Sequence, residues 1–258
     1  MNPTLAHATS LLATSLLIGF AATGCASEEQ DDPAGEDGNT ASKASALTTP
    51  VEEASDNPSG NVDSTAVSGL MDAYEDFELA TLGGELPGGL DIDFESAVAG
   101  CATGDEQSGT VDMGCASDGE YTGSVTYEIG VKGSTSFVYF AMSDLCSSEL
   151  CIDGDGAVKV STSSEGASSV VAGNLTITRD VQIDELRYGV SVTTDGLGVT
   201  SEVVLWHDGQ SYVVSVSVGA DGTSYEISGS NGAWSCDLAG DATDLAGSCT
   251  NGADSFSL

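Results

Sequence analysis

The feature that most constrains the fold of this chain is a turn signal that recurs in its C-terminal half. Asp195-Gly196, Asp208-Gly209 and Asp221-Gly222 follow one another at intervals of 13 residues. Asp-Gly pairs readily adopt the positive φ angles that tight β-hairpin turns require. The residues between two such pairs can span about 36 Å as an extended strand. Equal intervals of this length predict a meander of long, neighbouring antiparallel strands.

The segments around these turns alternate between apolar and polar side chains. In one segment, the apolar face consists of Tyr212, Val214, Val216 and Val218. Similar alternation occurs within residues 121–131, 175–183 and 186–192. One apolar and one polar face is typical of an antiparallel sheet with one side in water. Because long twisted strands curl, we predict a mainly β fold with a half-barrel or barrel-like curved sheet, and a β-sandwich is the alternative.

One amphipathic segment precedes the predicted strands. Asp63 or Ser64 can cap a helix. Apolar residues then recur at helical spacing, namely Val67, Leu70, Met71, Tyr74 and Phe77. We therefore predict one N-terminal α-helix, packed on the sheet and ending before Gly83-Gly84.

The chain begins with an apolar run over residues 10–23, and its first 25 residues contain no Asp, Glu, Lys or Arg. The run is too short to span a membrane comfortably, but it suits the central region of a secretory signal peptide. It leads into Ala22-Thr23-Gly24-Cys25, which resembles the lipobox of bacterial lipoproteins.

The resemblance implies that residues 1–24 are a signal peptide and that Cys25 becomes the acylated N-terminus, carrying palmitate or a similar chain as a membrane anchor. Ala26 stands where Asp would imply retention at the inner membrane. We therefore expect a lipoprotein of the cell envelope, at the outer membrane or the cell surface. Cleavage by an ordinary signal peptidase, giving a secreted or periplasmic protein, is the alternative.

Residues 25–62 combine the lipidated cysteine with a stretch that is rich in acidic and small residues. Such a stretch has few large apolar side chains to offset the entropy that ordering costs. We predict a disordered acidic tether here and a β-rich, disulfide-stabilised domain over residues 63–258.

Six cysteines follow residue 62, and an even number in an exported chain predicts three disulfides. Repeated local contexts around these cysteines favour one of the fifteen possible pairings. The predicted pairs are Cys101 with Cys115, Cys146 with Cys151, and Cys236 with Cys249. Zinc is the alternative, but no C-x₂-C spacing occurs.

The formal charge is −36, from 41 acidic and five basic residues. This excludes nucleic acid as a partner, because the phosphate backbone would be repelled. The charge has two interpretations, a well-hydrated soluble surface or binding of divalent cations. Asp153 and Asp155 in a predicted loop, and Asp91 with Asp93, could ligate calcium, although Asp and Gly are also ordinary turn residues.

Catalytic motifs are absent from the sequence. After residue 25 the only histidine is His207, which we expect to be exposed because it precedes the Asp208-Gly209 turn. No G-x-S-x-G motif, P-loop or dinucleotide fingerprint occurs. A secreted enzyme that uses carboxylates is the least favoured hypothesis, and no cofactor other than calcium is indicated.

The sequence therefore favours a non-enzymatic, lipid-anchored binding or structural module whose ligand is unknown. One alternative is a carrier that holds a lipid-like apolar ligand in the cavity of a curved sheet. In that case Tyr121, Tyr127, Tyr188 and Tyr212 would line a void, whereas in a filled core they would pack the interior. A calcium-binding β module is the other alternative.

Overall fold

The computed structural model describes residues 37–81 and 100–258, apart from short gaps at 106, 118, 149, 164–165, 180–181, 196–197, 220–221 and 240–245. Its helices are α2 (Asp37–Asp56), α3 (Ser64–Thr81) and the short α5 (Met113–Ala116). The first strands are β1 (Ala102–Gly104), β2 (Ser108–Asp112), β3 (Thr122–Lys132), β4 (Thr135–Cys146), β5 (Cys151–Ser163), β6 (Gly166–Arg179) and β7 (Gln182–Asp195). The last strands are β8 (Gly198–His207), β9 (Gln210–Gly219), β10 (Gly222–Gly229), β11 (Gly232–Ala239), β12 (Ala246–Thr250) and β13 (Ser255–Ser257).

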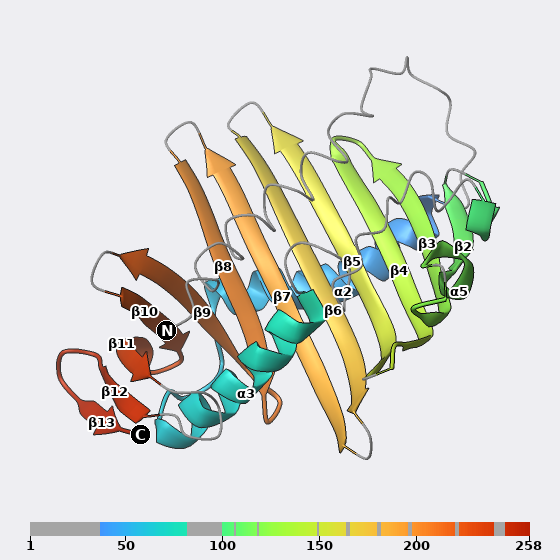
Figure 1. Ribbon diagram of the computed structural model, residues 1–258. Helices are drawn as coiled ribbons and strands as arrows, with labels where there is room; N and C mark the ends of the chain where they lie inside the picture. Colours follow the sequence, from blue (N-terminus) through green and yellow to red (C-terminus); the bar gives the residue numbers. More distant parts are fainter. Residues whose placement is uncertain are drawn as a thin grey trace.

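The described strands form one 13-stranded sheet in which each strand pairs with its neighbours in the sequence (Figure 1). The pairs of neighbouring strands are all antiparallel, so the predicted long-stranded meander is confirmed. The Asp208-Gly209 turn has positive φ angles at both residues, as the hairpin prediction requires. The sheet is open and does not close into a barrel, and because it is a single sheet the sandwich alternative is wrong.

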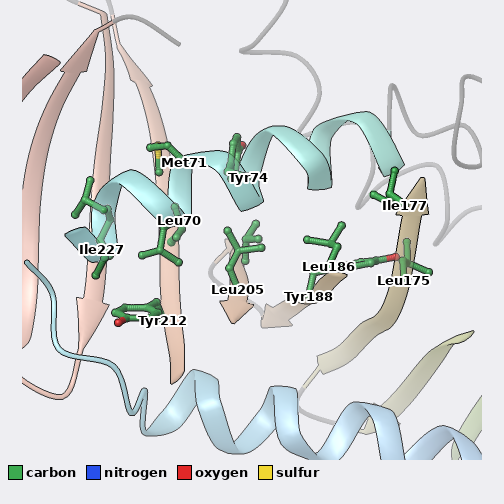
Figure 2. Close-up of a cluster of buried hydrophobic side chains, with 14 of the residues drawn as sticks. Leu70, Met71, Tyr74, Leu175, Ile177, Leu186, Tyr188, Leu205, Tyr212 and Ile227 are labelled. Atoms are coloured by element: carbon green, nitrogen blue, oxygen red, sulfur yellow. The ribbon is translucent and has the colours of Figure 1, made fainter. Parts of the chain in front are cut away.

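Helix α3 covers one face of the sheet, as predicted. Asp63 caps it by accepting hydrogen bonds from the backbone N–H groups of Thr65 (3.0 Å) and Ala66 (2.9 Å). Figure 2 shows Leu70 on the side of α3 that faces the sheet, above Leu205. On the same face of the sheet, an in-register apolar row crosses the strands through Val138, Val158, Val171, Val190, Val203, Val214 and Ile227. The predicted end of this helix near Gly83-Gly84 lies outside the described residues.

Helix α2 was not predicted, and it corrects two expectations. Residues 37–56 are helical and packed on the sheet, so the prediction of a disordered tether is wrong for them, and α3 is not the only long helix. The buried positions of α2 are Thr40, Ala41, Ala44, Thr48, Val51 and Ala54. The signal peptide, Cys25 and the tether up to residue 36 lie outside the described residues.

Helix α2 crosses the other face of the sheet and touches each strand from β3 to β9 (Figure 1). Twenty helical residues are about 30 Å long, and six spacings between seven strands cover about 29 Å. The length of α2 therefore matches the width of sheet that it spans.

Small residues in the sheet let α2 approach closely. Ala157, Ala172 and Gly189 are paired directly in register on β5, β6 and β7. Val51 of α2 lies so close to Gly189 that a Cβ at that glycine would be 2.3 Å from a Val51 methyl carbon. Small side chains line both the helix and the sheet here, so the two surfaces pack together without large apolar residues. This explains why the composition of the segment indicated disorder.

Two of the five basic residues tie α2 to the sheet. Lys43 forms an ion pair with Glu128 on β3 and lies over the ring of Tyr139, 5.1 Å from its centroid. Lys159 on β5 contacts Glu52 of the helix at 2.8 Å. Both ion pairs are partly exposed, so each contributes at most about 1 kcal/mol to stability. Together they fix the position of α2 along its own axis on the sheet.

The connection between α2 and α3 brings the chain from one face of the sheet to the other. It passes the ends of β9 and β10, where Gly60 donates a backbone hydrogen bond to Ser211 (2.9 Å) and accepts one from Ser230 (2.7 Å). The ring of Tyr212 lies against Gly60, where an added Cβ would be 2.1 Å from the ring. The segment 37–81 therefore packs on both faces of the sheet.

Candidate functional site

The structure has the three disulfides that the sequence predicts. Cys236 and Cys249 lie opposite each other on β11 and β12 and are buried, with exposed fractions of 1% and 0%. Cys146 and Cys151 join the ends of β4 and β5 and are half-buried. The third bond joins Cys101 to Cys115.

The third disulfide closes the β1–β2 hairpin against α5. There Asp112 caps the short helix by accepting a hydrogen bond from the backbone N–H of Cys115 (3.1 Å). All three bonds therefore link segments that are close in sequence, and this is why local context was enough to pair them.

The proposed calcium ligands do not form a loop. Asp153 and Asp155 lie inside strand β5, so the predicted loop is wrong. Asp153 accepts a hydrogen bond from the backbone N–H of Asp144 (2.8 Å), at a β-bulge between β4 and β5. Asp155 accepts one from the hydroxyl of Tyr139 (3.3 Å).

No group of three or more potential metal ligands comes together among the residues that the structure describes. Asp91 and Asp93 lie outside those residues. The structure therefore gives the two β5 carboxylates partners within the protein and adds nothing that favours calcium.

His207 is half-buried, not exposed as expected from its position before a turn. It is the last residue of β8, and its imidazole ring lies against Gly69 of α3, where a Cβ would be 2.1 Å from a ring carbon. Its Nε2 is 3.6 Å from a carboxylate oxygen of Asp208. The histidine therefore serves as a packing surface for α3.

Of the four tyrosines that could have lined a carrier cavity, two are buried in the core and two are half-buried. Tyr188 is buried with its ring over Gly173, and burial raises the pKa of its phenol to about 12. Tyr212 is buried against Gly60. Tyr127 is half-buried and donates a hydrogen bond to the carbonyl of Asp105 (2.7 Å), and Tyr121 is also half-buried. Figure 2 shows Tyr188 and Tyr212 among the core side chains, an arrangement that favours a packed core.

A polar row lies on the α2 face of the sheet, beside the helix. It consists of Asp155 on β5, Asn174 on β6 and Arg187 on β7, which are paired in register, together with Trp206 on β8. Arg187 precedes Gly189 by two residues, or about 7 Å along the strand. Because Gly189 lies under α2, the polar row runs alongside the helix.

Contacts within the protein position three side chains of the polar row, those of Arg187, Trp206 and Asp155. The guanidinium of Arg187 stacks on the indole of Trp206, 4.3 Å from the ring centroid. Trp206 in turn packs against an apolar cluster that Val51 and Ala54 of α2 form with residues of the sheet, called the α2 cluster below. At the other end, the hydroxyl of Tyr139 is bonded to Asp155, and burial first, then the charge of Asp155, raises the pKa of this tyrosine.

Chemically, the polar row offers hydrogen-bond donors at Arg187, acceptors at Asp155, and both kinds at Asn174. Asn174 and Arg187 are exposed, and Asp155 is half-buried. The row could not be recognised in the sequence, because its members lie far apart in the chain. The one available signal was a polar residue within each apolar strand, at positions that register alone brings together.

No protein-family model, curated protein or solved structure matches this chain. Within the described ranges, neither long helix has the length and apolar character that a membrane-spanning helix requires.

Proposed function

We propose that this chain is an exported, non-enzymatic β-sheet module, held at the cell envelope by a lipid on Cys25, whose broad face binds a partner or ligand. The observation that carries the export part of the proposal is the pairing of all six described cysteines into three disulfides. Disulfides of this kind persist in oxidising compartments outside the cytoplasm. The lipid part rests on Ala22-Thr23-Gly24-Cys25.

The architecture suits a rigid display surface. Helices on opposite faces brace the central strands, and both are continuous with the N-terminal segment that would carry the lipid. Between Cys25 and the start of α2 at Asp37 there are eleven residues, which can reach at most about 40 Å when fully extended. A lipid on Cys25 would therefore hold the sheet close to the membrane, closer than a tether that runs to residue 62 would allow.

The experiment is detergent phase separation of the protein expressed from its full-length gene in a bacterial host, with metabolic labelling by an alkyne fatty acid. The wild-type protein is expected in the detergent phase with label attached, and Cys25→Ser is expected unlabelled in the aqueous phase. A wild-type protein that stays unlabelled and aqueous would contradict the anchor and leave free secretion as the explanation of the disulfides.

A further inference from the structure

Arg187 is unusual among the basic residues of this acidic protein. Lys43, Lys159 and Arg179 each form an ion pair with a carboxylate. Arg187 and Lys132, both exposed, have no carboxylate partner within the described part of the chain, and of these two only Arg187 stacks on an aromatic ring, that of Trp206. Stacking on an aromatic ring orients a guanidinium while leaving its edge N–H groups available to donate hydrogen bonds to a ligand.

The two residues beside Arg187 extend this donor into a longer hydrogen-bonding surface. Asn174 and Asp155 follow it in register, one strand apart, so the three side chains cover about 10 Å across the sheet. The exposed amide of Asn174 makes no side-chain hydrogen bond to any described residue. Asp155 uses one oxygen for Tyr139 and keeps a second acceptor oxygen.

A ligand that satisfies the whole row must accept hydrogen bonds at Arg187 and donate them at Asp155, at intervals of about 5 Å. Hydroxyl groups both donate and accept, so a chain of sugar rings meets this requirement. A simple anion would suit Arg187 alone, and it would be repelled by Asp155 and by the overall charge of −36. Helix α2 forms a wall along one side of the row, which suits an elongated ligand lying across the strands.

We propose that the polar row of Asp155, Asn174, Arg187 and Trp206 binds a neutral oligosaccharide that runs across the strands, alongside α2. This inference rests on the proposed role as a binding module and names the class of ligand. Tyr139 acts as a positioning residue, because its hydroxyl orients the carboxylate of Asp155.

The test uses the purified, disulfide-bonded protein and a panel of neutral tetrasaccharides built from glucose, mannose or N-acetylglucosamine. Binding is measured by ligand-observed NMR and by quenching of tryptophan fluorescence. At least one probe is expected to bind with an affinity that changes less than about twofold between low and high salt, because no charge is neutralised. No binding by any probe at 10 mM would overturn the proposal.

Variants locate the binding site. Arg187→Gln is expected to weaken binding at least about tenfold, because it removes charge-assisted hydrogen bonds, and Asn174→Ala by a smaller factor. Lys132→Gln is the matched control, since it removes an exposed cation at the far end of β3 and is expected to leave affinity unchanged. Near-ultraviolet circular dichroism checks that each variant is folded.

Two outcomes would refute the assignment while leaving the lipid anchor standing. If Arg187→Gln and Lys132→Gln bind a probe equally well, the ligand does not lie on the polar row. If an acidic tetragalacturonate binds more tightly than every neutral probe and loses affinity in salt, the ligand class is anionic. Partitioning of the protein into detergent is independent of both results, so the two proposals fail separately.

Discussion

The packing of Val51 of α2 against Gly189 of β7 allows a direct test of whether residues 37–56 belong to the folded protein. Val51 is 1% exposed, so Val51→Ala removes two buried methyl groups at about 0.8 kcal/mol each. The cavity that remains raises the expected loss to about 2–3 kcal/mol. Gly189→Ala places a methyl group 2.3–2.9 Å from three atoms of Val51, and such overpacking costs about 1–3 kcal/mol.

The double variant distinguishes a specific contact from two unrelated effects. In Val51→Ala/Gly189→Ala, the two valine methyl carbons at 2.3 and 2.4 Å from the new methyl group are gone, and only the close approach to the Cβ of residue 51 at 2.9 Å remains. We therefore expect the double variant to lose less stability than the sum of the two single losses, with a coupling free energy of at least about 1 kcal/mol. Gly100→Ala is the control for the general effect of replacing glycine, since nothing lies within 4 Å of its added Cβ.

The assay is urea unfolding with the disulfides intact, followed by tryptophan fluorescence, because Trp206 packs against the α2 cluster. Stability changes are compared at equal m-values. If the three variants each change the free energy of unfolding by less than about 0.5 kcal/mol, residues 37–56 are not docked on the sheet. Additive losses would also refute the contact between Val51 and Gly189.

Three further predictions use the same unfolding assay. Between about pH 10 and pH 12, the free energy of unfolding should fall by about 1.4 kcal/mol per pH unit, because the phenol of Tyr188 ionises in the unfolded chain but not yet in the folded one. Below about pH 10 the phenol is neutral in both states, so its full contribution to stability is present. Tyr188→Phe should reduce the dependence of the unfolding free energy on pH above pH 10. Gly60→Ala should destabilise the protein by several kcal/mol relative to Gly100→Ala, since its methyl group meets the buried ring of Tyr212; equal stabilities would disprove the close approach. Asp63→Ala should lower the free energy of unfolding by about 1 kcal/mol through loss of the α3 cap, whereas Asp63→Asn should keep most of the capping contribution because asparagine also caps helices.

Local signals in the sequence were sufficient for the parts of the fold that neighbouring residues determine. The hairpin turn at Asp208-Gly209 depends on the φ angles that two adjacent residues tolerate. The start of α3 depends on one capping side chain and the periodic apolar positions that follow it. Hairpin topology then places each strand beside its predecessor, so the order of the sheet and the disulfide pairing follow from the order of the chain.

Helix α2 shows where such reasoning failed. Its buried face is built from alanine, threonine and valine, whose individual burial is too small to predict order from composition. What stabilises this helix is the complementary row of Ala157, Ala172 and Gly189, a surface that exists only once three strands are in register. The aspartates of β5 were misassigned for a related reason, since Asp-Gly favours turns locally but lies here within a long paired strand.

The sequence by itself determined a mainly β meander, one capped helix and three local disulfides, because turn chemistry, side-chain periodicity and short loop closure act over a few residues. Only the tertiary structure decided that α2 spans seven strands, that Gly60 passes the ends of β9 and β10, and that Asp155, Asn174 and Arg187 stand side by side. These features depend on strand register and on the fit between surfaces distant in the chain. Both are set by the free energy of packing the whole sheet and not by the preferences of any one segment.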